Sequence, residues 1–204
     1  MAQNKLIIFV KAPRPGTVKT RLAQSIGSKA ACAAYCEMVQ KMIQELSPLK
    51  DVQLRFCPDD AREEFRQWQA PDWELQPQGE GDLGERLQAA FEQAFAGGAL
   101  RVLVIGSDCP AITIEDIRAA WAALETFDLV LGPARDGGYW LIGLTRLHRQ
   151  LFEGIAWSTE TVLRETLARA RSAGLTVKLL RELNDVDTLA DWEQFKAVLS
   201  PSKC

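Results

Sequence analysis

The side chain with the clearest chemical potential is Asp108, which comes after the apolar run Val102-Leu-Val-Ile105 in the segment Gly106-Ser-Asp-Cys-Pro110. The run predicts a buried strand, and α/β sheets bind their ligands at the carboxyl ends of such strands. A carboxylate at that position can bind a divalent metal ion. A helix cap is the alternative role, but Thr113 is better placed for it. We therefore expect Asp108 to contact a metal ion or a ligand.

A basic loop, Lys11-Ala-Pro-Arg-Pro-Gly-Thr-Val-Lys-Thr-Arg-Leu22, follows the first predicted strand and leads into a helix. Its backbone amides and the cations Arg14, Lys19 and Arg21 can converge on phosphates at that junction. The loop is not a Walker A motif, because Val18 stands where a glycine is expected before the Lys-Thr pair. A P-loop kinase or ATPase is therefore disfavoured, and a solvated basic loop is the alternative to a phosphate site.

A glycine-rich segment, Gln78-Gly-Glu-Gly-Asp-Leu-Gly-Glu-Arg-Leu87, precedes another predicted helix. Its three glycines within six residues allow the backbone to approach a flat ligand closely. The alternative is a surface turn in which Asp82 caps the helix. The local sequence alone does not decide between a loop that contacts a ligand and a capped turn.

Polar and aromatic residues gather at a predicted hairpin turn in Gly132-Pro-Ala-Arg-Asp-Gly-Gly-Tyr-Trp-Leu-Ile-Gly-Leu144. Asp136-Gly137 is a strong signal for a turn between two strands. The neighbouring Tyr139 and Trp140 are more typical of a small-molecule pocket. The segment therefore predicts either a turn or a turn that also borders a binding site.

Two later segments also carry candidate residues. Trp157-Ser-Thr159 precedes a helix and is either a cap with a buried indole or part of a site. Asn184-Asp-Val-Asp-Thr188 places two carboxylates between the last predicted strand and the last helix. If one of them caps the helix, the other is free to be a second metal ligand.

The elements that must position these residues alternate along the chain. Apolar runs predict strands near residues 6–10, 52–57, 102–105, 129–131, 139–144 and 177–180, and periodic patterns predict helices near 29–46, 59–69, 83–96, 113–124, 158–173 and 189–199. This alternation implies βαβ units and an α/β fold of three layers, α/β/α, around a mostly parallel sheet. The close pair of strands around Asp136 introduces an antiparallel strand and makes the sheet mixed. No linker interrupts the pattern, so we expect a single domain over residues 1–204.

Composition narrows the class of protein. The chain has 204 residues, 47% of them hydrophobic and 25% charged, with a formal net charge of -3. The acidic balance argues against a nucleic-acid binder, which usually carries a basic face. No apolar stretch approaches the roughly 20 residues of a membrane helix, and the first residues lack a signal-peptide pattern. We expect no nucleic-acid partner, no membrane span and a cytoplasmic location.

The metal expected at Asp108 is a hard, oxygen-bound ion. The five cysteines are scattered, without a Cys-x-x-Cys pair, and His148 is the only histidine. These features argue against a zinc site. Trp68 and Trp73 indicate a helix-packed pair of indoles, with a contact surface or a lid over the site as alternatives, so a monomer and a homodimer both stay open.

Six segments, taken in chain order, resemble one known family. They are the loop Lys11 to Leu22, Gly81-Asp-Leu-Gly84, Gly106-Ser-Asp-Cys-Pro110, Asp136-Gly-Gly-Tyr-Trp-Leu-Ile-Gly143, Trp157-Ser-Thr159 and Asp185-Val-Asp-Thr188. Over nearly its whole length the chain resembles the bacterial GT-A-like glycosyltransferase family of unknown substrate, often called selenodomain-associated transferase 1. It is more distantly similar to 2-phospholactate guanylyltransferase, the molybdopterin nucleotidyltransferases and the sugar-acid cytidylyltransferases.

The resemblance implies a nucleotide-diphospho-sugar transferase (GT-A, Rossmann-like) fold and a role for each matching position. Nucleotide-binding residues would be Ala12, Pro13, Arg14, Gly16, Lys19, Arg21, Gln78, Gly81, Asp82 and Gly84, and metal ligands would be Asp108 and Asp187. Acceptor-binding residues would be Asp136, Gly137, Gly138, Tyr139, Trp157, Ser158 and Thr159. Lys19 and Arg21 would stabilise the leaving group, and Asp136 is either a general base or only a turn residue.

The implied function is a transferase that needs Mg²⁺ or Mn²⁺ and uses a nucleotide or nucleotide-sugar donor with a small-molecule acceptor. Glycosyl transfer is the leading expectation. Many glycosyltransferases of this fold carry Asp-x-Asp at the first metal site, however, whereas this chain has Asp108-Cys109-Pro110. Nucleotidyl transfer from a nucleoside triphosphate to a small phosphorylated or carboxylated acceptor is therefore the alternative, and a non-catalytic nucleotide-binding module is a second one.

Overall fold

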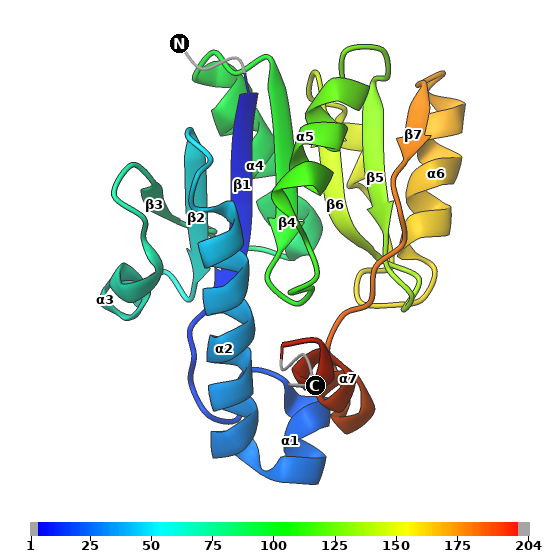
Figure 1. Cartoon of the computed structure of the whole chain (residues 1–204). Coiled ribbons are helices and arrows are strands. Elements are labelled where there is room, and N and C mark those ends of the chain that lie inside the picture. Colours follow the sequence, from blue (N-terminus) through cyan, green and yellow to red (C-terminus); the bar gives the residue numbers. More distant parts are fainter. Residues whose placement is uncertain (1–3, 200–204) are drawn as a thin grey trace.

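The computed structural model describes residues 4–199, which form one seven-stranded sheet with helices on both faces (Figure 1). The strands lie in the order β3-β2-β1-β4-β6-β5-β7. Their bounds are β1 Asn4–Lys11, β2 Val52–Cys57, β3 Glu74–Pro77, β4 Arg101–Gly106, β5 Leu129–Pro133, β6 Tyr139–Leu144 and β7 Val177–Leu179. β6 pairs antiparallel with both β4 and β5, and the other pairings are parallel. The predicted mixed, mostly parallel sheet is confirmed.

The helices are α1 Thr20–Ile26, α2 Ser28–Leu46, α3 Arg62–Phe65, α4 Leu83–Ala96, α5 Ile114–Ala123, α6 Val162–Ser172 and α7 Leu189–Leu199. Buried side chains of α2 and α5 pack with Leu6, Ile8 and Val10 on one face of β1. Those of α4 and α6 pack with Ile7 and Phe9 on the other face (Figure 1). Alternate residues of one strand thus enter two separate cores, as the three-layer prediction requires. In the described part of the chain, no helix is long and apolar enough to cross a membrane.

Capping residues fix where two helices begin, close to the edge of the sheet where Asp108 lies. Asp82 accepts a hydrogen bond from the Glu85 amide while the Glu85 carboxylate accepts one from the Asp82 amide, which completes a capping box for α4. Thr113 and Asp116 form the corresponding box for α5. Because Thr113 caps α5, as the sequence predicts, Asp108 is left available for another role.

Two predicted helices need correction, and one strand was not predicted. The helix expected over residues 59–69 is only α3 followed by a 3₁₀ turn, Arg66–Trp68, which turns the Trp68 ring toward Tyr35 and Phe65, with ring centroids 6.0 and 5.7 Å apart. Edge strand β3 is short and its apolar side chains are few, so the sequence did not indicate it. α6 begins at Val162 rather than at 158, because residues 156–161 form a turn.

The two indoles that suggested a contact surface are buried. Trp68 is 5% exposed and Trp73 is 3% exposed, and the Trp73 Nε1 donates a hydrogen bond to the Leu49 carbonyl. Both belong to the core that covers β1 and β2. Burial of both indoles in the core, rather than exposure on a contact surface or in a lid, is the observed arrangement.

An ion pair between the buried Asp116 and the half-exposed Arg181 joins α5 to the segment after β7, and its removal should destabilise the fold. Arg181 donates through Nε and Nη2 to the two carboxylate oxygens of Asp116, each at 2.6 Å. Burial alone raises the pKa of Asp116, but the hydrogen bonds from Arg181 and Thr113 outweigh it and hold that pKa below its ordinary value. We expect Asp116→Asn to lower the free energy of unfolding at pH 7 by about 2 kcal/mol, as for hydrogen bonds to charged groups.

The pH dependence of that difference tests the assignment. A carboxylate whose pKa is depressed by folding stabilises the protein above its unfolded-state pKa of about 3.9, and this contribution is lost as the pH falls through the folded-state value. The free energies of unfolding of wild type and Asp116→Asn, measured by urea denaturation, should therefore begin to converge below about pH 5 and continue to converge as the pH falls through the folded-state value, which lies below about 3.9. Asp72→Asn, at an exposed turn position, is the control that should match wild type throughout. A gap that stays constant down to the lowest pH would contradict the role given to this pair.

Candidate active site

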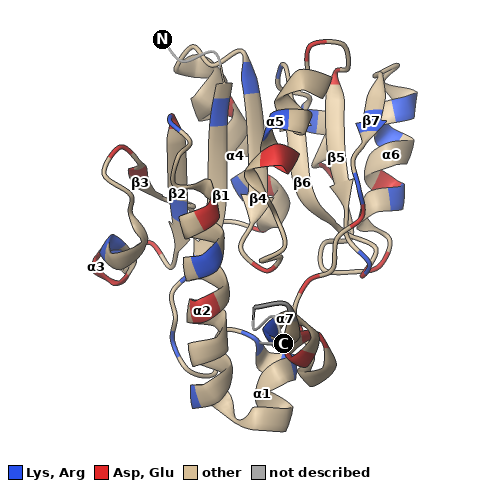
Figure 2. Ribbon diagram, viewed as in Figure 1, with Lys and Arg blue, Asp and Glu red and all other residues tan. Residues whose placement is uncertain are grey.

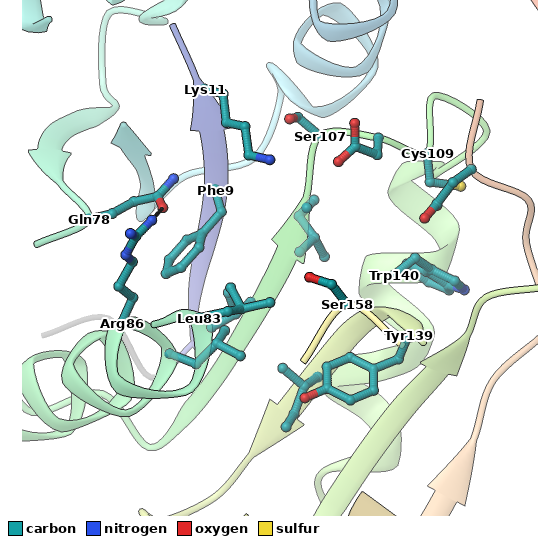
Figure 3. Close-up of a pocket in the computed structure, with 17 residues that line it drawn as sticks. Phe9, Lys11, Gln78, Leu83, Arg86, Ser107, Cys109, Tyr139, Trp140 and Ser158 are labelled. Carbon is teal, nitrogen blue, oxygen red and sulfur yellow. Dashed lines mark hydrogen bonds between the residues drawn. The ribbon is translucent and has the colours of Figure 1, made fainter. Parts of the chain in front are cut away.

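A cleft of about 310 Å³ opens at the carboxyl ends of β1 and β4, where the order of strands reverses along the sheet. Such reversals are where open α/β sheets bind ligands. Strands β1 and β4 line one part of the cleft, with Phe9, Lys11 and residues 104–109 (Figure 3). Helix α4 and strand β6 line another part, with Leu83, Arg86, Leu87, Tyr139, Trp140 and Ile142. The remaining lining residues are Gln78, Ser158 and Asp185. Asp108 therefore lies in the cleft that its sequence context predicts.

Asp108 faces a buried lysine. The Lys19 Nζ lies 2.5 Å from Asp108 Oδ1 and 3.2 Å from Asp187 Oδ1, and the Lys19 side chain is 2% exposed. Desolvation lowers the pKa of Lys19, but the two carboxylates outweigh it and raise that pKa above its ordinary value. The two predicted metal ligands and the predicted catalytic lysine are thus brought together, although they come from three distant segments.

The other two predicted cations of the loop, Arg14 and Arg21, have different carboxylate partners. Arg21 is 70% exposed and its Nη1 lies 3.5 Å from Asp187 Oδ2, so it belongs to the same charged group as Lys19. Arg14 instead donates to the Glu64 carboxylate of α3. Its guanidinium points toward α3, a contact that the local sequence does not reveal because the partners are 50 residues apart.

The rest of the loop shapes the chain around these cations. Ala12 is buried and donates its amide to the Cys57 carbonyl, while the Pro13 carbonyl accepts a hydrogen bond from the Cys32 thiol. Gly16 has φ +88° and open space around its Cα. Lys19 itself has φ 50° although it is not a glycine, and it stands immediately before α1. The seven-residue helix α1 follows the loop directly and is separated from α2 by Gly27.

The segment before α7 supplies two acidic side chains, and neither caps that helix. Thr188 caps it: the Thr188 Oγ1 accepts a hydrogen bond from the Asp191 amide, and the Asp191 carboxylate accepts hydrogen bonds from the amides of Thr188 and Asp187, which corrects the expectation that Asp185 or Asp187 is the cap. Burial raises the pKa of Asp185 to about 7, and repulsion from Asp108 and Asp136 adds to the rise. Figure 2 shows this acidic segment close to the basic start of α1.

The carboxylates fit a hard divalent cation. Within residues 4–199 there is no cluster of three or more His, Cys, Asp or Glu side chains able to hold a metal by itself. Mg²⁺ does not need one, because it is commonly held by one or two carboxylates together with water and substrate phosphates. Asp108 and Asp187 already bracket the Lys19 ammonium, which shows that their oxygens are placed to share one cation. The metal itself stays a prediction.

The glycine-rich segment forms one wall of the cleft, but its predicted residues differ in role. Gln78 is buried and its Nε2 donates to the carbonyls of Val10 and Arg55, which leaves its Oε1 to accept from Arg86 Nη1 at 3.4 Å (Figure 3). Gly81 has φ +92°, and its carbonyl accepts a hydrogen bond from Arg86 Nε. The wall is therefore a rigid structure held by Arg86.

Two other predicted residues of that wall are engaged in structure. The Asp82 side chain is the cap of α4. A Cβ at Gly84 would lie 2.6 Å from Trp157 Nε1 and 2.8 Å from the Phe152 carbonyl, so this glycine permits close packing of the 152–157 segment on α4. The glycine that looked like a ligand contact thus connects the wall to Trp157.

The hairpin turn contributes fewer cleft residues than the sequence suggested. The amide of Gly138 donates to Asp136 Oδ1 at 2.9 Å, so Asp136 forms the turn and is exposed. Gly137 lies against the backbone of Glu160. Tyr139 and Ser158 do face the cleft (Figure 3), whereas the Thr159 hydroxyl donates to the Ala156 carbonyl. Asp136, Gly137, Gly138, Trp157 and Thr159 are not among its lining residues.

Sequence reasoning missed three charged residues of the cleft. Lys11 ends β1 and is exposed, and within the described residues it has no carboxylate within 4.0 Å. Arg86 lies one turn into α4, and Asp185 lies two residues before Asp187, the predicted metal ligand. A search for charged residues at strand ends and first helical turns would have included Lys11 and Arg86.

Comparison with known proteins gives the family. The model of the family described as "Uncharacterized protein conserved in bacteria (DUF2064)" matches residues 42–159. The chain belongs to this family. A crystal structure of a "putative nucleotide-diphospho-sugar transferase" from Desulfovibrio desulfuricans G20 is 37% identical, with a TM-score of 0.92, over 100% of this chain and 90% of that chain. No curated protein sequence matches the DUF2064 chain.

More distant solved structures share the fold. A CMP:2-keto-3-deoxy-manno-octonic acid synthetase complexed with CTP is 10% identical over 98% of this chain and 99% of that one, with a TM-score of 0.60. A 4-diphosphocytidyl-2C-methyl-D-erythritol synthase from Anaerococcus prevotii DSM 20548 is 12% identical over 97% and 99%, also at 0.60. The DUF2064 chain therefore has the nucleotide-diphospho-sugar transferase fold, as the resemblance implied, and its named relatives are transferase enzymes.

Proposed function

We propose that this DUF2064 protein is a metal-dependent transferase that uses a nucleotide-activated donor, with a nucleotide sugar as the leading donor. The observation that carries the proposal is the pairing of Asp108 and Asp187 around Lys19 at the carboxyl edge of the sheet. The Desulfovibrio protein, which is 37% identical, is named as a nucleotide-diphospho-sugar transferase, and this name supports a nucleotide sugar as the donor. The finer family, the selenodomain-associated transferase 1 type, is part of the same proposal.

The charged group suits the stabilisation of an anionic leaving group. A nucleoside diphosphate gains negative charge as its bond to the sugar breaks, and fixed cations at that point lower the barrier. Lys19 and Arg21 would supply two such charges, and Lys11 at the cleft edge would supply a third. Bound Mg²⁺ or Mn²⁺, held by Asp108 and Asp187, would add Lewis-acid stabilisation of the phosphate oxygens.

The opposite side of the cleft would position the acceptor. Tyr139 and Ser158 face the cleft (Figure 3). Trp157, which does not line the cleft, packs closely against Gly84 in the first turn of α4. A small molecule held there needs mainly to be aligned with the donor, since orientation alone contributes much of an enzymatic rate. Asp136, exposed and bonded to the Gly138 amide, suits a turn better than a general base.

Calorimetric titration tests the proposal. We expect nucleoside diphosphates or nucleotide sugars to bind, and to bind at least tenfold more tightly when Mg²⁺ or Mn²⁺ is present, about 1.4 kcal/mol. A panel of the four common bases with the same metal would identify the donor. If no nucleotide binds with or without metal, the proposal is wrong.

Nucleotidyl transfer is the second candidate, because the end of β4 offers one carboxylate rather than two. Cys109 is 1% exposed and its thiol donates to the Asn184 carbonyl, so the position after Asp108 is filled by a packed side chain. The fold neighbours include a cytidylyltransferase-type synthetase with bound CTP. Release of pyrophosphate from a nucleoside triphosphate in an acceptor screen would identify this reaction, since glycosyl transfer releases none.

The cytoplasmic location and the assembly state, monomer or homodimer, also stay proposals. Both can be checked by fractionation and by sedimentation of the purified protein. Neither the donor nor the acceptor proposal depends on them.

A further inference from the structure

Lys19 occupies the position where the two predicted metal ligands converge. Its ammonium is within 3.2 Å of a carboxylate oxygen on Asp108 and on Asp187, and only 2% of its side chain is exposed. The two carboxylates are far more accessible, with side chains 47% and 35% exposed. Solvent and solutes therefore reach the carboxylates, while the lysine approaches them from the protein side.

The backbone holds this arrangement in place. Lys19 has φ 50° and ψ 47°, the left-handed region that non-glycine residues adopt rarely. On either side of it, Val18 and Leu22 are buried in the core under α2. Such a conformation persists where the surrounding structure compensates for it, and two ion pairs to the Lys19 amine supply that compensation here. The inward direction of the lysine is thus part of the fold.

A divalent ion bound between Asp108 Oδ1 and Asp187 Oδ1 would take the place of the Lys19 ammonium. Mg²⁺ sits about 2.1 Å from its oxygen ligands, close to the place that Nζ now takes beside Asp108 Oδ1. Both cations would also repel each other at such a distance. Metal binding between these two oxygens therefore requires that Lys19 first leave them.

A bound polyphosphate would draw Lys19 away from the two carboxylates. Lys11 and Arg21 are exposed cations at the same edge of the sheet, so an anion bound by them would lie close to Lys19. The phosphates would replace the two carboxylates as partners of the ammonium, while the incoming metal would take over the carboxylates. Each cation would then keep an anionic partner.

We propose that Lys19 is a built-in competitor for the metal, which holds Asp108 and Asp187 until a nucleotide's phosphates release it. This proposal rests on the proposed function, because it assumes that a metal and a nucleotide meet in this cleft. It makes their binding mutually dependent, since each ligand favours the same displaced position of Lys19. The free protein then binds metal weakly.

Titration with Mn²⁺ alone, followed by calorimetry and by the electron paramagnetic resonance signal of free Mn²⁺, tests the competition without any assay of turnover. We expect Lys19→Met to bind Mn²⁺ at least tenfold more tightly than wild type does. Lys19→Arg, which keeps the charge, should stay as weak as wild type. Lys11→Met removes the same charge from the same cleft without touching either carboxylate, so it should change the Mn²⁺ affinity less than threefold.

Folding is monitored by the midpoint of thermal unfolding. Mn²⁺ should raise that midpoint in Lys19→Met more than in wild type, because the metal replaces the lost counter-charge. Lys19→Gln, which can still donate hydrogen bonds to the carboxylates, is the second variant if Lys19→Met does not fold. Adding Asp108→Asn to either variant should abolish the gain in affinity.

Equal Mn²⁺ affinity in wild type and in both neutral variants, including no binding by any of them, would overturn the proposal. A gain as large in Lys11→Met as in Lys19→Met would also overturn it, because the effect would then be general electrostatics. The proposed function fails separately, by absence of nucleotide binding to wild type under every metal condition. Nucleotide binding that is metal-dependent, together with unchanged Mn²⁺ affinity in Lys19→Met, would reject the competition and keep the function.

Discussion

Replacing Asp108 with asparagine is expected to lower turnover by at least about 100-fold, the size of effect seen when one preorganised electrostatic contact to a transition state is lost. The amide keeps the shape of the side chain but removes the charge that would hold the metal and that now pairs with Lys19. Measurement of product formation with the donor found by titration, at saturating Mg²⁺ or Mn²⁺, gives the ratio. The metal-dependent part of nucleotide binding should fall together with turnover.

The matched control for this variant is Asp72→Asn, which makes the same chemical change at an exposed turn far from the cleft. It should keep wild-type turnover. The free energy of unfolding should be measured for both, because Asp108→Asn also leaves the buried Lys19 with a single carboxylate. If Asp108→Asn is folded and fully active, Asp108 has no catalytic role; if no turnover is found for wild type while nucleotides bind, the protein is a non-catalytic nucleotide-binding module.

The sequence predicted the elements that local patterns determine. Apolar runs located β1 and β4, because strands covered on both faces tend to be continuously apolar. The helix α4 was predicted to its exact residues, since Asp82 caps its start and two glycines follow its end. β3 was missed because it is an edge strand with alternating exposed residues and is only four residues long.

The sequence predicted many residues of the candidate site but not which side chains contact each other. Asp108 follows from its place after a strand, whereas the partner of Arg14 is Glu64, on α3, and no local pattern indicates that contact. The inward direction of Lys19 depends on a left-handed backbone position that the sequence Val-Lys-Thr does not announce. Contacts between segments more than 100 residues apart, such as Lys19 with Asp187, arise only when the sheet is assembled.

The glycines show the same difference between composition and role. Three glycines before α4 suggested a close approach to a ligand, yet Gly84 makes room for Trp157. Gly137 in the hairpin makes room for the backbone of Glu160. A glycine in a motif thus identifies a close approach, and only the tertiary structure says whether the approaching atom belongs to a ligand or to the protein.

Gly137→Ala is the substitution for which we expect the largest loss of stability, about 4 kcal/mol in the free energy of unfolding. Gly137 has φ +87°, which strains any residue with a Cβ. That Cβ would also lie 2.1 Å from the Glu160 carbonyl oxygen, and backbone atoms cannot turn aside as the end of a side chain does. The hairpin and the 156–161 turn would have to separate, which would also displace Tyr139 and Ser158 in the cleft.

Gly174→Ala separates the two causes, because Gly174 also has a positive φ, +67°, but no atom lies within 4 Å of its added Cβ. Strain alone acts there, and we expect a loss of about 1–2 kcal/mol. Urea denaturation of the two variants and wild type gives both numbers. Equal losses would mean that the hairpin accommodates the added methyl group at no extra cost. The close contact between residues 137 and 160 would then not be the cause of the alignment of Tyr139 and Ser158.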